Sequence, residues 1–233
     1  MQSGTPLYYA ALLGHEDIVK LLIDKGADVN ANIGDDLSPQ SILDAASFNL
    51  PEETPQVNNV KKEIFNFLVK NGAKSKKLLI KSVRKGNVER VIALSNQQFV
   101  NTIYNDTGAT LLHLAAQYDN KKIVASLIAK GGEVNANDNN RLTPLHLAAY
   151  FGNDEVLELL ISKGAKINAE STIGETPLDK AISQNQKDTI KILYKHFAKT
   201  GKIKSKKDFN AKNSIFKLPS ADEMKKGAKI EVI

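Results

Sequence analysis

The chain has 233 residues, of which 42% are hydrophobic and 25% are charged, and its formal net charge is +6 at neutral pH. This hydrophobic content can fill a core, so it excludes a chain that is disordered throughout. The absence of cysteine excludes disulfides, thiolate metal sites and chemistry at sulfur, and it favours an intracellular compartment over secretion.

The N-terminal stretch MQSGTPLYYAALLGHEDIV has no basic segment followed by an apolar one, as a secretory signal would. Nowhere in the chain do about 18 apolar residues follow one another without interruption, which is roughly what a membrane span requires. We therefore expect a soluble chain without a secretory signal or a membrane span.

A repeated motif divides the chain into six segments. The motif occurs as TPLYYAA at Thr5, SILDAAS at Ser41, KLLIKSV at Lys77, TLLHLAA at Thr110, TPLHLAA at Thr143 and TPLDKAI at Thr176. Successive starts are 36 or 33 residues apart, and apolar runs such as IVKLLIDKGADVNA and VLELLISKGAKINA follow the motif and contain a glycine. A fixed period of this length is typical of architectures built from stacked repeats.

The unit that starts at Thr143 predicts two helices joined by a turn. Thr143 can cap a helix, and Pro144 suits its first position because no hydrogen bond is lost there. Gly152 can end this helix with positive φ, and residues 154–161 (DEVLELLI) predict a second, amphipathic helix. One such unit buries too few apolar side chains to fold alone, so neighbouring units must stack.

A 33-residue unit with the pattern T-P-L-H-x-A resembles the ankyrin repeat. The resemblance covers residues 3–197, is strongest at 108–137 and 141–169, and is degenerate between residues 41 and 101. It implies an all-α solenoid of about six helix-turn-helix units with short hairpin loops, occupying residues 1–197. We expect the lysine-rich tail, residues 198–233, to be partly disordered or docked on the last unit.

The middle of the array departs from the repeat pattern at two places. Residues 47–60 are longer than a turn between two helices, and we expect them to form a projecting loop in which Pro51 and Pro55 prevent regular helix. Gly72 lies only five residues before Lys77, so the hairpin between the second and third units should be largely missing.

The polar residues that recur along the array predict structural roles. His113 and His146 occupy the same place in successive units, where we expect buried imidazoles that bond to the backbone. Asn30, Asn135 and Asn168 are expected to stabilise turns. Because no nucleophile, phosphate-binding or metal-ligand motif occurs, we expect no enzyme activity, no catalytic or cofactor-binding residues, no cofactor and no metal.

The resemblance also implies where a partner binds. In ankyrin-like units, the two residues after the A-A pair and those around the glycine ahead of T-P lie on the concave face or at the hairpin tips. These positions include Leu12, Leu13 and Ala109. The partner-binding residues that we predict are Arg84, Lys85, Gln117, Tyr118, Leu142, Tyr150, Phe151, Ile173, Glu175, Ser183 and Gln184.

Four of these residues are apolar or aromatic side chains that the repeat fold does not require. They are Tyr118, Leu142, Tyr150 and Phe151, and a contiguous exposed apolar patch is typical of an interaction surface. The alternative is that Tyr150 and Phe151 pack against helix ends or against a hairpin of the next repeat.

The positive charge is concentrated in two segments. Residues 70–90 carry eight basic residues against Glu89 alone, and residues 195–233 carry eleven lysines against four acidic residues. Either cluster could bind an acidic or phosphate-bearing surface such as RNA or a phospholipid membrane.

We therefore expect a non-catalytic scaffold or adaptor that binds a protein partner. We do not expect nucleic acid or a membrane as the partner, and we expect a monomer. The composition, with 29 lysines to 3 arginines and 21 asparagines, suggests an AT-rich genome and is similar to ankyrin-repeat proteins of intracellular bacteria. It predicts a cytoplasmic protein, or an effector delivered to a host cytosol. The alternatives are electrostatic binding of RNA or phospholipid by residues 70–90 and the tail, and a regulatory fragment of a larger enzyme.

Overall fold

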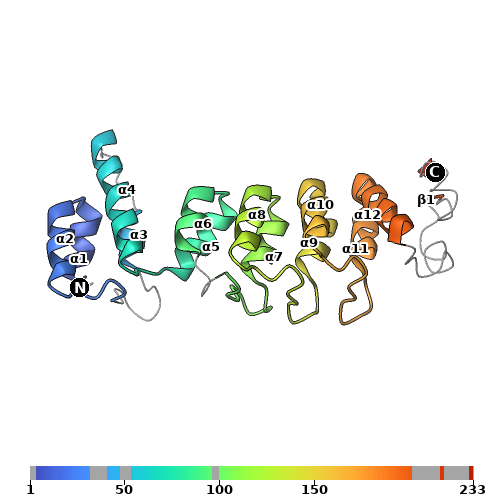
Figure 1. Cartoon of the computed structure of the whole chain (residues 1–233), viewed down its shortest axis with the longest axis horizontal. Coiled ribbons are helices and arrows are strands. Elements are labelled where there is room, and N and C mark those ends of the chain that lie inside the picture. The colour runs from blue at the N-terminus through green and yellow to red at the C-terminus, as the bar shows by residue number, and fades with distance from the viewer. Residues whose placement is uncertain are drawn as a thin grey trace. The chain divides into compact units, whose positions relative to one another are not determined.

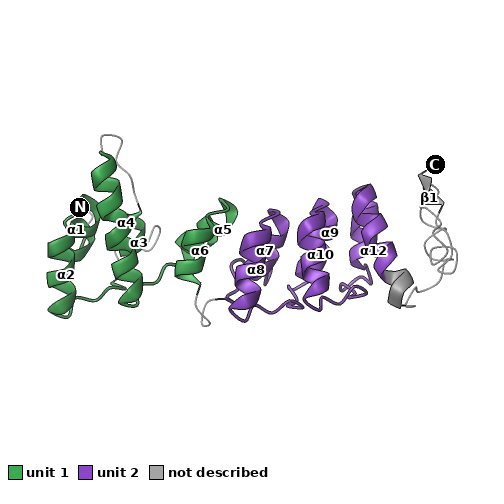
Figure 2. Cartoon of the chain, turned by 45° about the horizontal axis from the view of Figure 1, so that its top comes forward, with its two compact units in different colours: residues 1–99 green, residues 100–233 purple. Residues whose placement is uncertain are grey.

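A computed structural model describes residues 4–31, 41–47, 54–95, 100–200, 216–217 and 231–232 of the chain. The chain divides into two compact units, unit 1 with residues 1–99 and unit 2 with residues 100–233 (Figure 2). No helix in the described ranges is long and apolar enough to cross a membrane.

Unit 1 contains six described helices. They are α1 (Pro6–Leu13), α2 (Glu16–Asp24), α3 (Ile42–Ala46), α4 (Pro55–Lys70), α5 (Lys76–Arg84) and α6 (Val88–Leu94). α1 packs against both α2 and α3, α3 packs against α4, and α5 packs against α6. The helices therefore form three successive pairs.

Unit 2 contains the other six described helices and a short strand pair. The helices are α7 (Leu111–Gln117), α8 (Lys121–Ala129), α9 (Pro144–Phe151), α10 (Asp154–Ser162), α11 (Pro177–Ser183) and α12 (Lys187–Thr200). α9 packs between α7 and α11, while α10 packs between α8 and α12, so the pairs form two layers. In Figure 1 the hairpins that join these pairs project from one side of the unit. The predicted all-α array of helix pairs is confirmed.

The tail adds one antiparallel strand pair, in which β1 (Phe216–Lys217) lies opposite β2 (Glu231–Val232). The short helix that a capping-box pattern at Ser220 suggests falls outside the described residues.

Local sequence explains where the helices begin and end. At α9, Thr143 is the N-cap, Pro144 takes the first helical position, and Gly152 ends the helix with φ of 72°. Leu145, Ala148 and Ala149 are fully buried. Since alanine is small, α7, α9 and α11 can approach one another closely along this row.

The prediction of a loop over residues 47–60 is wrong at its C-terminal end. α4 begins at Pro55, and the Thr54 side chain accepts a hydrogen bond from the Val57 amide at 3.5 Å. Proline stops a helix in its interior but is favoured at its first position, so Pro55 starts the helix here. Residues 48–53 lie outside the described part of the chain.

The second departure from the repeat is confirmed, because only residues 71–75 separate α4 from α5. At the other end, α12 continues to Thr200, three residues past the predicted boundary at residue 197.

Two histidines of unit 2 are buried and bond to the backbone, as predicted, and each also connects one helix pair to the next hairpin. His113 Nδ1 lies 3.1 Å from the Thr110 amide nitrogen, and its Nε2 lies 2.9 Å from the Leu142 carbonyl oxygen in the next hairpin. His146 repeats both contacts, with Thr143 at 3.0 Å and with the Glu175 carbonyl at 3.1 Å. An amide must donate to Nδ1 and a carbonyl must accept from Nε2, so each imidazole is neutral with its proton on Nε2.

Asparagines make a second set of connections. Asn135 donates to the Gly164 carbonyl at 3.1 Å and accepts from the Lys166 amide at 2.8 Å. Asn30 makes the same pair of bonds with Gly72 and Lys74. The predicted turn-stabilising role is therefore confirmed for Asn30 and Asn135, and each side chain also ties one helix pair to the next.

Candidate protein-binding surface

Three aromatic side chains lie at the C-terminal ends of α7 and α9, the first helices of two neighbouring helix pairs in unit 2. Tyr118 is the residue that ends α7, and Tyr150 and Phe151 are the last two residues of α9. Tyr118 is 46% exposed and Phe151 is 43% exposed, while Tyr150 is half-buried. We call these three residues the aromatic surface.

The Tyr150 and Phe151 rings pack edge to face, with centroids 5.0 Å apart. Edge-to-face pairs of this kind are favourable beyond the area that they bury, by about 0.5–1.5 kcal/mol. The alternative that both rings pack against the next repeat fails for Phe151, because nearly half of its side chain remains accessible.

Side chains from the following helix pair hold the ends of these helices. Asn153 Nδ2 donates to the carbonyls of Ala116 at 2.7 Å and Gln117 at 3.1 Å. Gln186 Nε2 donates to the Tyr150 carbonyl at 3.2 Å. These bonds occupy carbonyls that the helix end leaves without an intrahelical partner. The backbone beneath the aromatic surface is therefore fixed before any partner arrives.

Acidic groups border Tyr118. Burial raises the pKa of the Asp119 carboxyl, and the charges of Glu155 and Asp154 raise it further. Asp119 also has a φ of 55°, in the left-handed region that favours glycine. Lys121 forms an exposed ion pair with Glu155 at 3.1 Å, which offsets part of this negative charge.

The predicted hairpin residues differ in exposure. Ile173 is 77% exposed, whereas Leu142 and Glu175 are half-buried and their carbonyls bond to His113 and His146. Ala109 is only 4% exposed, so its expected place on an accessible surface is wrong. The adjacent bridge between Ile103 and Thr110 folds the hairpin over it.

The remaining predicted residues are accessible. Ser183 and Gln184 are exposed at the end of α11, Gln117 is half-buried beside Tyr118, and Arg84 and Lys85 are exposed at the end of α5 in unit 1. Lys76, Lys77 and Lys81 are exposed on the same helix. We call the five cations of α5 and its cap, Lys76, Lys77, Lys81, Arg84 and Lys85, the basic face.

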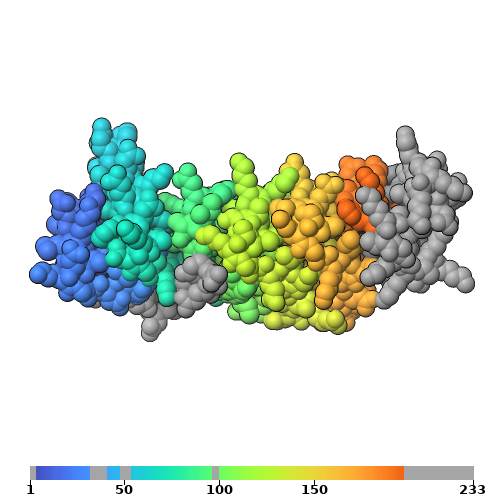
Figure 3. Space-filling view, viewed as in Figure 1, coloured from blue at the N-terminus to red at the C-terminus, as the bar shows by residue number. Residues whose placement is uncertain are grey.

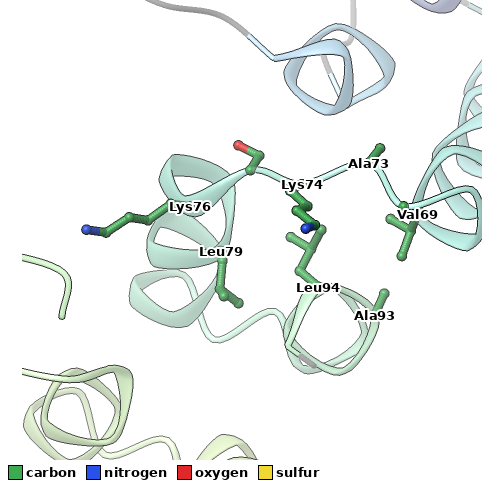
Figure 4. A pocket seen from close by; sticks show the side chains of 9 residues that line it. Val69, Ala73, Lys74, Lys76, Leu79, Ala93 and Leu94 are labelled. Carbon is green, nitrogen blue, oxygen red and sulfur yellow. The ribbon is translucent and has the colours of Figure 1, made fainter. Parts of the chain in front are cut away.

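A small cavity lies where the hairpin before α5 is missing (Figure 4). Val69, Ala73, Leu79 and Leu94 are among its lining residues, and its volume is about 50 Å³. A water molecule needs about 10–15 Å³ of volume measured in this way, so the cavity holds a few water molecules and is too small for a larger ligand. Within the described ranges, no three His, Asp or Glu side chains form a group that could hold a metal ion.

Sequence reasoning missed several functional features. Asn101 forms the same two-bond connection as Asn135, to Gly131 at 3.1 Å and Glu133 at 2.9 Å, although it is followed by threonine and lacks the V-N-A context. Asn153 and Gln186 were also missed. Their common sequence signal is an asparagine or glutamine directly after the residue at which the chain turns between the two helices of a pair.

A second apolar patch was only partly predicted. Leu13, Ile18 and Leu21 are each about half exposed on α1 and α2. Ile123 and Val156, which occupy the place of Ile18 in later units, are fully buried. Val156 lies on α10, which packs between α8 and α12. In the space-filling view, successive pairs of unit 2 pack closely on the face that is seen (Figure 3).

Comparison with known proteins identifies the repeat. A family model described as ankyrin repeats, in three copies, matches residues 56–138 and 119–207. A single ankyrin-repeat model matches residues 4–32. No curated protein matches the chain.

Proposed function

Because the chain belongs to the ankyrin-repeat family, we propose that it is a non-catalytic scaffold or adaptor that binds a protein partner through the aromatic surface and the hairpin tips. Ankyrin repeats are generally protein–protein interaction modules.

One observation carries the proposal. Tyr118 and Phe151 are large aromatic side chains, nearly half exposed, at matching ends of adjacent helices that pack against each other. Stacking of the repeats does not use their exposed faces. Aromatic residues of this kind are enriched among the side chains that contribute most to binding.

The binding free energy that the aromatic surface can supply alone is limited. Two half-exposed aromatic rings could remove about 200 Å² from water on binding, which corresponds to roughly 5 kcal/mol at about 25 cal/mol per Å². Association costs about 4–15 kcal/mol in lost freedom of motion. Other residues must therefore contribute. The predicted set supplies Gln117 next to Tyr118, and Ile173, Ser183 and Gln184 elsewhere in unit 2.

The test is the double substitution Tyr150→Ala with Phe151→Ala. We expect loss of the proteins captured from a relevant lysate by the wild type, with helical circular dichroism nearly unchanged and only a small loss of thermal stability from the missing ring pair. Tyr9→Ala with Leu13→Ala is the matched control, because it removes exposed apolar area of similar size from unit 1. Capture that survives the first pair of substitutions would refute the proposal.

In this role the protein would act in a cytoplasm, or in a host cytosol if it is delivered as an effector. The low arginine-to-lysine ratio and the high asparagine content support the effector form only through genome composition. The test is a secretion assay in a candidate bacterium with the protein fused to a reporter. Retention of the fusion inside the bacterium would count against the effector form.

Electrostatic binding of RNA or phospholipid remains the second candidate function, because the basic face clusters five cations on one short helix. Most of the tail that could assist it lies outside the described residues. Association that weakens steeply with added salt would support this reading.

A further inference from the structure

We propose that the basic face of α5 binds an acidic segment of a protein partner, one that carries several carboxylates around an apolar side chain. This inference rests on the proposed function, because it names the chemistry of the partner that the repeat scaffold would hold.

The basic face is dense and has an apolar centre. α5 has nine residues and no acidic residue in its first turn, and Lys85 follows it as the cap. Lys76, Lys77, Lys81, Arg84 and Lys85 line one shallow concavity together with Ile80. A nine-residue helix is about 13 Å long. The five cations therefore lie close together, on a surface that a few carboxylate groups would span.

The opposite side of α5 provides its attachment to unit 1. Leu78, Leu79, Ser82 and Val83 are buried there. The Ser82 hydroxyl donates to the Leu78 carbonyl at 2.7 Å, so it needs no other partner. The cations are therefore not required to hold the helix in place.

These cations are also not neutralised by acidic side chains in the described part of the chain. The ion pair nearest in sequence joins Lys62 of α4 to Glu89 of α6 at 3.3 Å, and it includes no residue of α5. Within the described ranges, none of the five cations takes part in an ion pair. Like charges this close repel one another, and an acidic ligand would relieve that repulsion.

The repeat register gives the basic face the positions that carry the aromatic surface in unit 2. When Gly86 is aligned with Gly152, Arg84 and Lys85 take the places of Tyr150 and Phe151. Lys81 takes the place of Leu147. Positions that carry apolar or aromatic side chains in the later repeat are therefore cationic in this one, so the two repeats select different chemistry.

An acidic protein segment fits this surface better than a long polyanion does. Residues 1–69 of the same unit carry ten acidic residues against four basic ones, and these would repel the remainder of a nucleic acid or an anionic membrane. α5 also exposes no aromatic ring on which a base could stack. The Arg84 guanidinium can bind a carboxylate in a forked geometry, as it can a phosphate.

The experiment uses the full chain and a defined probe. The probe is a fluorescein-labelled peptide with four glutamates on each side of one leucine, and its binding is followed by fluorescence anisotropy. A peptide with glutamine in place of glutamate is the comparison. A uridine decanucleotide and vesicles containing phosphatidylserine are tested in parallel at the same salt concentrations.

Lys81→Gln with Arg84→Gln removes two charges from the basic face. Lys163→Gln with Lys166→Gln, at exposed positions in unit 2, removes the same net charge elsewhere. We expect the first pair to weaken binding of the acidic peptide about tenfold, because the variant loses two exposed ion pairs with the peptide. The second pair should change binding by less than about twofold, and the glutamine peptide should not bind.

Three results would overturn the inference: no peptide binding at low salt, an equal loss in both substituted proteins, or tighter binding of the decanucleotide or the vesicles. These outcomes are separate from the test of the aromatic surface. If Tyr150→Ala with Phe151→Ala abolishes partner capture while the α5 substitutions affect no probe, the proposed function stands and this inference fails.

Discussion

At the scale of single residues, one position of the repeat carries aspartate in two repeats and histidine in two others. Asp44 and Asp179 accept hydrogen bonds from the backbone and hydroxyl of their own caps, Ser41 and Thr176. His113 bonds to its cap in the same way but also reaches the next hairpin. The histidine ring therefore makes a contact between neighbouring repeats in addition to the contact with its own cap.

The two histidines predict how stability depends on pH. Burial lowers the pKa of His113 and of His146, and the bonds to the Leu142 and Glu175 carbonyls oppose this only in part. Both imidazoles are neutral in the folded and unfolded states above about pH 6.5, the ordinary value for histidine. Below it the unfolded chain binds protons first, so the free energy of unfolding falls as the pH drops from about 6.5 toward the lowered pKa values.

The measurement is the urea midpoint at several pH values between 8 and 5. The variant His113→Asn with His146→Asn should be less stable at pH 8, by about 2 kcal/mol for the lost connections between units. Its midpoint should change less than that of the wild type between pH 6.5 and 5. Parallel pH profiles for the two proteins would show that these histidines do not carry the effect.

At the scale of helices, the residues at the helix ends determine how the aromatic surface is held in place. α9 ends at Gly152, and a Cβ added there would lie 2.4 Å from Gln186 Oε1. Gln186 is the residue whose amide holds the Tyr150 carbonyl at 3.2 Å. The close approach of Gly152 to the next helix pair therefore permits the bond that fixes the aromatic surface.

Substitution of this glycine tests that arrangement. Gly152→Ala combines backbone strain at positive φ with displacement of Gln186, and we expect it to lower the free energy of unfolding by about 2–3 kcal/mol. Gly164→Ala is the control, because Gly164 also has positive φ but has no atom within 4 Å of an added Cβ. For Gly164→Ala we expect the free energy of unfolding to fall by about 1 kcal/mol, from backbone strain alone. Equal losses in chemical unfolding experiments would show that contact with Gln186 adds nothing.

At the scale of the whole molecule, the two units differ in how regularly they are built. Unit 2 has three consecutive pairs with complete hairpins, and α9 and α10 each pack between neighbours on both sides. Unit 1 has the shortened link before α5 and the long helix α4. Stability in stacked repeats comes from contacts between neighbours, so the two units should differ when separated.

We expect a fragment of residues 100–233 to fold alone. Three consecutive repeats are roughly the minimum for a stable array, and this fragment retains them with their histidine and asparagine connections. The check is a cooperative urea transition with helical circular dichroism per residue slightly below that of the full chain, because the described helices cover 54 of the 134 residues of this fragment and 108 of the 233 residues of the chain. The matched fragment of residues 1–99 should unfold at lower urea, and a reversed order of stability would contradict the prediction.

The residues themselves determined the repeat, the helix caps and the buried histidines. Each depends on contacts within one unit or on a period along the chain. The start of α4 was mispredicted for a local reason, since proline interrupts a helix in one position and begins it in another. Thr54 directly precedes Pro55, and a threonine followed by a proline is typical of a helix start. The sequence around Pro55 was therefore sufficient to predict where α4 begins.

Only the tertiary structure decided which side chains remain accessible. Ile18 and Val156 are equivalent in sequence, yet one is 48% exposed and the other is buried. Ala109 is covered by its own hairpin, whereas Phe151 is left open at the end of α9. Exposure depends on atoms contributed by neighbouring helix pairs, about 30 residues away along the chain, and a pattern read within one unit does not contain them.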